Sequence, residues 1–145
     1  MINTDDAPKI LITRLKLSHQ MLTDLISQIQ LLLRSYNQAK PKLRELYKNL
    51  QDHFGIQDTK FYERLSLHFV DDRESAKMLE FLLHDLKDFK IKYLVFYDQH
   101  PAEMIGGHPR MFPLEFTEFA KNILSRITME EDYLFSLLEK LSVQS

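Results

Sequence analysis

An arginine and a glutamate stand four residues apart in the segment SRITMEEDYLF, which runs from residue 125 to residue 135. The apolar residues around them recur at helical spacing, with Glu130 inside the apolar face and Arg126 at its edge. An unpaired charge inside a protein is costly, so this pair needs a chemical reason. Three reasons are open at this point: a working metal site, a metal site that has lost a ligand, and a structural ion pair.

Histidines elsewhere in the chain could complete a metal site around Glu130. His19, His53 and His84 each lie in a predicted helix, and a helical bundle can hold a metal ion with inward-facing side chains. His19 and His53 project from the edges of their apolar faces. At ~100° per residue, His84 projects nearly opposite the apolar face of its helix, so we expect it to point outward. These positions favour ordinary core-edge histidines over metal ligands.

Arg126 argues against a metal ion at this centre. A guanidinium has only donors and stays cationic, so it cannot be a metal ligand and would repel a metal cation. It could instead take the place of the cation, pair with Glu130 and donate a hydrogen bond to Gln57, which also projects inward. The residues therefore predict a central polar network of Gln57, Arg126 and Glu130, with no metal or other cofactor.

The sequence offers little for catalysis. It has no cysteine and no Gly-x-Ser-x-Gly segment, and its one glycine pair, Gly106-Gly107, lacks the Lys-Ser/Thr that follows in a phosphate-binding loop. His100 and His108 flank prolines, and we expect both to be exposed loop residues. We therefore expect a protein that is not an enzyme.

The composition is that of an ordinary soluble domain. The chain has 145 residues, 44% of them hydrophobic and 28% charged, with a net charge of −2. Nucleic-acid and membrane-surface binding usually need a basic excess, so this balance argues against both. The N-terminus lacks the apolar core of a signal peptide, and the apolar runs fall short of the ~20 residues of a membrane span. The absence of cysteine fits a reducing compartment, so we expect a cytoplasmic protein.

Helical periodicity runs through almost the whole chain, and proline, glycine and the segment VDDRES punctuate it. The expected helices cover residues 8–38, 41–65, 73–98 and 113–142, with a flexible tail over 1–8 and a long loop over 99–112 between the last two. Gly55 interrupts the second helix, and Asp72 or Ser75 could cap the third. The pattern predicts a single domain over residues 1–145, an all-α up-down-up-down four-helix bundle.

Two segments resemble the hemerythrin-like family of four-helix bundles. HFGIQ, which begins at His53, is similar to that family's His-Phe-x-x-Glu-Glu pattern, with Gln57 in the place of a carboxylate. RITMEEDYLF is similar to its His-Ile-x-x-Glu-Glu-x-x-Leu-Phe pattern, with Glu130 kept and Arg126 in the place of the histidine. This resemblance implies a non-haem iron site for oxygen or metal sensing, built from His19, His53, His84 and Glu130.

Three segments are also similar to the regulator of sigma D (Rsd/AlgQ) family, small helical proteins that bind the housekeeping sigma factor of RNA polymerase. They are LQDHFGIQDTKFYERL, VFYD and LSRITMEEDYL, with matches at Leu50, Asp52, Tyr62, Glu63, Arg64, Asp98, Arg126, Glu130 and Glu131. The family has an arginine at the position of Arg126, so this resemblance explains that residue without a lost metal ligand. It implies a non-enzymatic transcription regulator of the anti-sigma type, which sequesters the C-terminal region of the sigma factor.

A partner surface can be placed on the predicted second helix. In the regulator of sigma D family, the acidic residue that matches Asp52 belongs to the surface that contacts the sigma factor. Helical projection puts Asp52, Ile56 and Glu63 on the side away from the core, and an acidic rim around an apolar residue suits a basic helical partner. The alternative is a solvated face, which any bundle has.

The predicted third helix is apolar on a second side as well. Phe81, Ile91 and Val95 project opposite its main core face, so this side needs cover. The 99–112 loop could supply it with four apolar side chains, those of Met104, Ile105, Met111 and Phe112. The alternative is another protein chain, which would make a homodimer through this helix.

Overall fold

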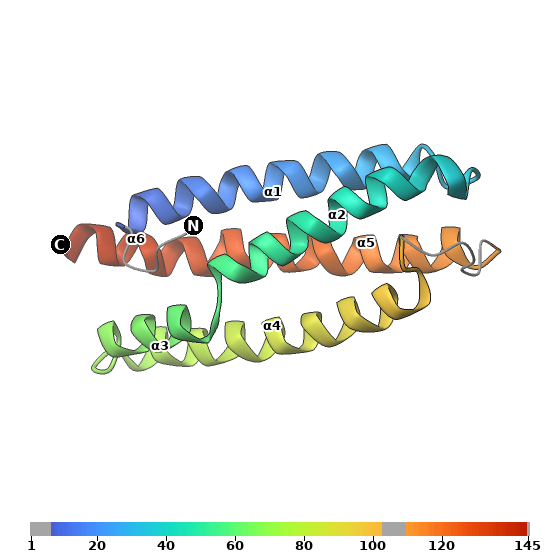
Figure 1. Cartoon of the computed structure of the whole chain (residues 1–145). Helices are drawn as coiled ribbons and strands as arrows, with labels where there is room; N and C mark the ends of the chain where they lie inside the picture. The colour runs from blue at the N-terminus through green and yellow to red at the C-terminus, as the bar shows by residue number, and fades with distance from the viewer. Residues whose placement is uncertain (1–6, 103–109, 145) are drawn as a thin grey trace.

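The structure is a computed structural model that describes residues 7–102 and 110–144. Every regular element within these two ranges is helical. The elements are α1 (Pro8–Gln30), α2 (Tyr36–Ile56), α3 (Thr59–His68), α4 (Arg73–Gln99), α5 (Phe112–Met129), the π-helix η1 (Glu130–Leu134) and α6 (Phe135–Gln144). These elements form four rods: α1, α2 with α3, α4, and the continuous run of α5, η1 and α6. Successive rods alternate in direction (Figure 1). The predicted all-α up-down-up-down four-helix bundle is confirmed.

The link between the first two rods lies earlier in the chain than the apolar pattern predicted. α1 ends at Gln30 instead of residue 38, and α2 begins at Tyr36, so Pro41 lies inside α2 rather than at its start. Leu33 and Tyr36 still pack against the core beyond the end of α1. Their burial continues the apolar spacing through the turn, which is why the pattern runs past the true end of the helix.

The second rod is broken rather than bent, and the break does not lie at Gly55. That glycine is inside α2, whereas the chain leaves the helix at Gln57, whose φ and ψ are −109° and 55°. Asp58 then caps α3, because its Oδ1 accepts the backbone N–H of Phe61 at 2.9 Å. We call residues 52–63, which span the break, the elbow. A good N-cap residue in mid-segment, and not the glycine, was the local signal for the break.

The remaining boundaries are close to those expected. Asp72 caps α4 as predicted, since its Oδ1 accepts the backbone N–H of Ser75 at 3.2 Å. The connection between α4 and α5 runs from residue 100 to residue 111, and residues 103–109 of it lie outside the described ranges. Pro8 already opens α1, so the predicted tail over 1–8 is too long at its inner end, and residues 1–6 lie outside the described ranges.

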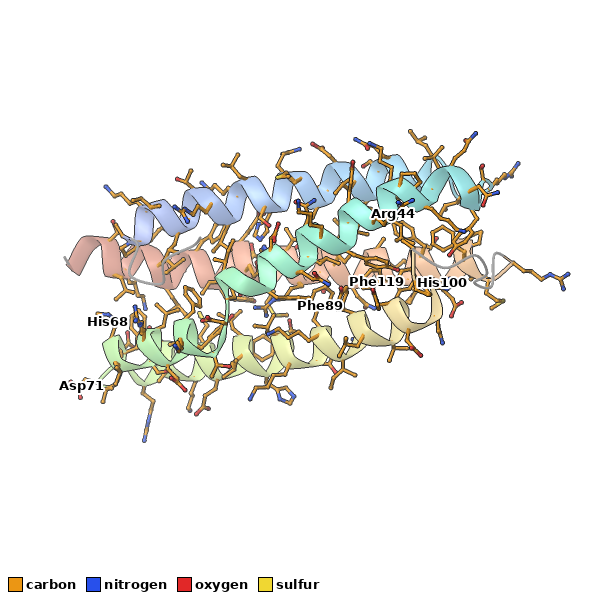
Figure 2. All side chains as sticks on the ribbon, in the orientation of Figure 1. Arg44, His68, Asp71, Phe89, His100 and Phe119 are labelled. Atoms are coloured by element: carbon orange, nitrogen blue, oxygen red, sulfur yellow. The ribbon has the colours of Figure 1, made fainter. Side chains whose placement is uncertain are left out.

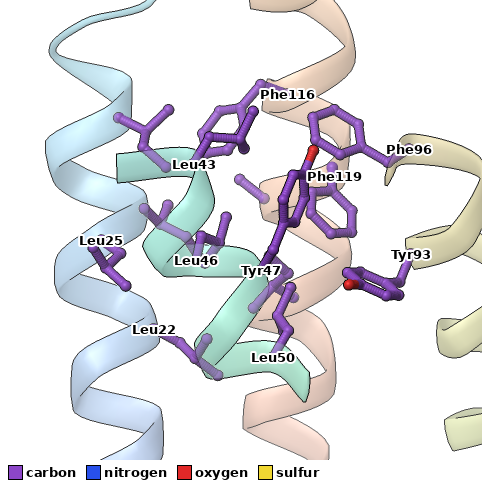
Figure 3. Close-up of a cluster of buried hydrophobic side chains, with 14 of the residues drawn as sticks. Leu22, Leu25, Leu43, Leu46, Tyr47, Leu50, Tyr93, Phe96, Phe116 and Phe119 are labelled. Atoms are coloured by element: carbon purple, nitrogen blue, oxygen red, sulfur yellow. The ribbon is translucent and has the colours of Figure 1, made fainter. Parts of the chain in front are cut away.

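The apolar core consists of two clusters stacked along the bundle. The first, drawn in Figure 3, combines the second half of α1 with α2, the end of α4, and α5. In it Phe89 of α4 stacks on Phe119 of α5, with ring centroids 6.4 Å apart (Figure 2). The second cluster combines the first half of α1 with α3, the start of α4, and α6. Phe54 packs against both clusters.

Polar residues mark the level at which one cluster gives way to the other. On α1, His19 falls between Leu15 of the second cluster and Leu22 of the first. On the last rod, Glu130 falls between Ile127 and Leu134 in the same way. His53 follows the same rule between Leu50 and Ile56. The buried side chains of Arg126 and Gln57 reach the same level, where they contact Glu130 and His53. The fold therefore places a polar layer between the two apolar clusters, across the middle of the bundle.

The outward side of α4 is apolar near its end, as predicted. Ile91, Leu94 and Val95 are each more than half exposed. Of the loop residues expected to cover this side, Met104 and Ile105 lie outside the described ranges, Met111 is itself exposed, and Phe112 is buried in the first cluster. Among the described helices, none is long and apolar enough to cross a membrane.

Candidate functional site

Arg126 lies in the polar layer, which engages all five of its N–H donors. Its Nε donates to Glu130 Oε2. Its Nη1 donates to the Leu82 carbonyl and to Asp85 Oδ2, and its Nη2 donates to Gln57 Oε1 and to Tyr62 Oη. The five distances lie between 2.8 and 3.1 Å. A buried guanidinium keeps its charge at low cost only when its donors are satisfied in this way. The structure thus brings Gln57, Arg126 and Glu130 together, and it adds partners from α3 and α4.

Glu130 is fully buried and accepts hydrogen bonds at both oxygens. Oε2 accepts from Arg126, while Oε1 lies 2.7 Å from His19 Nε2 and 2.8 Å from His53 Nε2. Burial alone would raise the pKa of this carboxyl. The charge of His53, the hydrogen bonds from His19 and His53 and the charge of Arg126 outweigh burial and hold the pKa well below its usual 4.5. Glu130 is therefore ionised at neutral pH, because the Arg126 guanidinium and the ring N–H groups around it stabilise the carboxylate.

His19 lies between two carboxylates. Its Nε2 faces Glu130 Oε1, and its Nδ1 faces Glu131 Oε2 at 2.8 Å. Burial lowers the pKa of this imidazole, but hydrogen bonds to Glu130 and Glu131 and their charges outweigh burial and raise the pKa above its usual 6.5. Two acceptors on opposite sides of one ring favour the doubly protonated form, since each ring nitrogen then donates.

His53 is held on three sides, and its contacts conflict. Its Nδ1 lies 2.7 Å from Ser18 Oγ, and its Nε2 lies 2.8 Å from Glu130 Oε1 and 3.1 Å from Gln57 Nε2. One ring nitrogen cannot donate to Glu130 and accept from an amide at the same time. The amide cannot be reversed, because Gln57 Oε1 already accepts from Arg126 and Tyr62. The shorter contact, to a buried carboxylate, places the proton on Nε2.

A π-helix begins at Glu130, in the polar layer itself. Neighbouring residues of an α-helix point ~100° apart, yet Glu130 and Glu131 both contact the ring of His19. The wider π turn changes the register of the last rod at this level, and such turns are frequent at functional sites. The sequence carries no local signal for it, since MEEDYL reads as ordinary helix.

The structure separates the predicted metal ligands into two groups. His19, His53 and Glu130 meet in the polar layer, and one potential ligand atom from each lies within 4.8 Å of the others. His84 is exposed on the outer side of α4, as its projection predicted. The larger ligand set implied by the hemerythrin-like resemblance is therefore not assembled, and the atoms present would suit a single ion such as Zn²⁺ or Fe²⁺.

Two observations bear on whether a single ion fits this set. The outer ring nitrogens of His19 and His53 are held by Glu131 and Ser18, in the manner of residues that orient metal ligands. Against this, the Arg126 cation is 2.8 Å from the other oxygen of Glu130, and it lowers the affinity of the carboxylate for a dication. The donor types fit, but the neighbouring charge opposes them.

The predicted partner surface needs one correction. Asp52 and Glu63 are exposed, as expected, but Ile56 is only 4% exposed and belongs to the second apolar cluster. The projection assumed one straight helix through residue 65. Because α2 ends at Ile56 and the chain turns there, its last turn is covered on a side that a continuous helix would leave open.

Sequence reasoning also misjudged His100. Its side chain is fully buried rather than exposed, with Nε2 3.0 Å from Glu115 Oε1, and its carbonyl accepts a hydrogen bond from Tyr47 Oη at 2.6 Å. It ends α4 and packs on Phe112, so it belongs to the core although it adjoins a proline. His108 lies outside the described residues.

Four members of the polar layer were not predicted: Ser18, Tyr62, Asp85 and Glu131. Ser18 and Glu131 are sequence neighbours of His19 and Glu130, and this adjacency was the only signal available for them. Burial raises the pKa of Tyr62 to about 12, so its hydroxyl stays neutral, accepting from Arg126 and donating to Gln57. Its place became evident only when α3 was positioned against α5.

Comparison of the chain with models of protein families, with curated proteins and with solved structures finds no match. The fold and the polar layer are therefore the observations from which a function has to be argued.

Proposed function

We propose that this chain is a non-enzymatic regulatory protein that binds another protein through the elbow. The observation that carries the proposal is the way the elbow is fixed. Gln57 at the break and Tyr62 in the first turn of α3 both bond Arg126, so the buried layer holds the two helices at one angle. Asp52 and Glu63 extend to solvent on either side of this fixed point. A rigid surface loses little entropy on binding, which favours recognition.

The chemistry of the elbow favours a basic helical partner. Its outward carboxylates at Asp52 and Glu63 complement lysine and arginine side chains, and they would steer such a partner toward the elbow. The resemblance to the regulator of sigma D family points to the C-terminal region of the housekeeping sigma factor of RNA polymerase. Binding there would mask a basic surface and keep the sigma factor from polymerase or from the promoter. We propose no nucleic-acid partner and no membrane partner for this chain.

Isothermal titration of the folded protein with that sigma region tests the proposal. We expect binding at micromolar concentration or tighter, and a loss of at least ~10-fold when both Asp52→Lys and Glu63→Lys are introduced. Glu45→Lys is the matched control, because Glu45 is an exposed acid on α2 outside the elbow. Absence of binding by folded protein contradicts the sigma assignment. An equal loss in the Glu45→Lys protein contradicts the elbow as the contact surface.

A second candidate function is the binding of one divalent metal ion, and the meeting of His19, His53 and Glu130 favours it. Two imidazoles and a carboxylate would hold Fe²⁺ or Zn²⁺, and an iron ion there would supply the chemistry of an oxygen or metal sensor. Metal analysis of protein prepared with iron or zinc supplied tests this, together with the thermal midpoint and the ultraviolet-visible spectrum. Stoichiometric metal that is lost in His53→Ala and kept in His84→Ala would support it. Substoichiometric metal in all three proteins would exclude it.

A further inference from the structure

An open groove runs along the outside of the bundle between α4 and α5. It has a volume of about 260 Å³, with Phe96 and Phe119 as its floor and Ile91 and Val95 on its α4 wall. Phe96 and Phe119 are only 5% and 2% exposed and belong to the first apolar cluster, so the floor of the groove is the surface of the core. The groove shares no residue with the elbow, so it is a separate surface.

The α4 wall of the groove continues into an exposed apolar ridge. Ile91 is 62% exposed, Leu94 60% and Val95 55%, all within five residues of one helix. Single exposed apolar residues are common, but three such neighbours beside an apolar groove are typical of an interaction surface. One surface thus offers both a ridge and a groove of matching apolar character.

The charges on the two walls have opposite signs. The α4 wall contributes Lys92, and the α5 wall contributes Glu115 and Glu118. Glu115 is engaged by His100 at 3.0 Å, and Glu118 is exposed at the rim. Lys92 lies 3.2 Å from Asp88 on its own exposed helix face, a contact of small energetic value that can be exchanged for another partner.

From these observations we infer that the α4–α5 groove is a self-association surface, and that its occupant is the α4 ridge of a second copy of this chain. A two-fold contact uses the same patch on both copies, so a ridge and a groove side by side can fill each other reciprocally. In that arrangement Lys92 of each copy meets Glu118 of the other. The two α4 helices also lie beside each other in this contact, because Ile91 and Val95 belong both to the ridge and to one wall of the groove.

Charge complementarity also distinguishes a second copy from an unrelated basic helix. A basic helix would gain from Glu115 and Glu118 but would be repelled by Lys92 on the opposite wall. The exposed residues on and beside the α4 ridge carry charges of both signs, Lys87 and Lys92 with Asp88 and Asp98, so the ridge can pair with each wall of the groove. One ridge seated in one groove buries less surface than an extended dimer interface, so we expect a concentration-dependent equilibrium between monomer and dimer.

Sedimentation velocity of the full chain across the micromolar range tests the inference. We expect a monomer–dimer equilibrium that Val95→Glu weakens by at least ~10-fold, because the new carboxylate would be buried against an apolar floor. Leu67→Glu is the matched control: Leu67 is 75% exposed on α3, away from the groove, and its replacement should leave the equilibrium unchanged. Both sites are exposed, and a urea melt of each variant confirms that it folds.

A charge exchange tests the specific pairing. Lys92→Glu alone and Glu118→Lys alone should each weaken the dimer, since each sets like charges together. The double variant should recover most of the wild-type dissociation constant. A monomer at every concentration overturns the inference, even if a basic amphipathic peptide binds the groove. So does a dimer that Val95→Glu leaves intact, or single charge variants without effect. None of these outcomes bears on partner binding at the elbow.

Discussion

Arg126 answers the question that the sequence raised about a charged pair on an apolar face. Its side chain donates to Glu130 and to four further acceptors, so it is a fully paired cation in the middle of the bundle. Through Gln57 and Tyr62 it also links the last rod to both sides of the elbow. A residue that looked like a lost metal ligand is thus the connection between the core and the proposed partner surface.

At the residue scale, Arg126→Met should destabilise the protein by about 3–5 kcal/mol, because Glu130 would stay buried with one fewer cation and the elbow would lose two hydrogen bonds. The free energy of unfolding in urea measures this. Lys121→Met is the control: Lys121 is exposed on the same helix, and its replacement should change stability by less than ~0.5 kcal/mol. An unchanged midpoint for Arg126→Met would mean that the ion pair does not hold the layer together.

At the scale of the elements, the second rod shows how a helix end is set. The Asp58 side chain accepts a hydrogen bond from a backbone N–H in the first turn of α3, and this cap favours the start of a new helix at that point. Gln57, just before it, has non-helical backbone angles and makes the turn. Gly55 takes no part in the break. It is exposed, and a Cβ added to it would meet no described heavy atom within 4 Å.

Gly55→Ala should therefore stabilise the protein by ~0.5–1 kcal/mol, because glycine inside a helix loses more backbone entropy on folding than alanine. Asp58→Ala, three residues away, should cost about 1 kcal/mol by removing the cap of α3. Urea midpoints of both variants against the parent chain provide the comparison. Loss of stability in Gly55→Ala would show that the elbow needs the glycine after all.

At the scale of the whole molecule, the polar layer makes stability depend on pH in both directions. The lowered pKa of Glu130 adds stability that is present above its unfolded value of 4.5 and is lost as the pH falls toward the folded pKa. The raised pKa of His19 adds stability that is present below 6.5 and is lost as the pH rises through the folded pKa. Stability should therefore be highest between these two values.

Urea unfolding across this pH range measures the effect, and His19→Gln separates the two contributions. The variant should lose the decline above pH 6.5 that the raised pKa of His19 produces, and keep the decline below pH 4.5 that the lowered pKa of Glu130 produces. If the variant and the parent chain show the same slope above pH 6.5, His19 is not the group responsible.

The sequence by itself determined the class of fold, the approximate rods and the inward direction of Gln57, Arg126 and Glu130. These follow from helical periodicity, which is a local property of the chain. It misplaced the end of α1, the break before α3 and the burial of Ile56, because a turn can keep apolar spacing and a projection assumes a straight helix.

Only the tertiary structure decided which atoms meet. Tyr62 and Asp85 reach Arg126 from 64 and 41 residues away, and His19 reaches Glu130 across 111 residues. No local pattern encodes such contacts, because they depend on the rotation and register of rods that pack against one another. The sequence could show that a charged pair had to be satisfied, whereas the packing of the four rods supplied the partners.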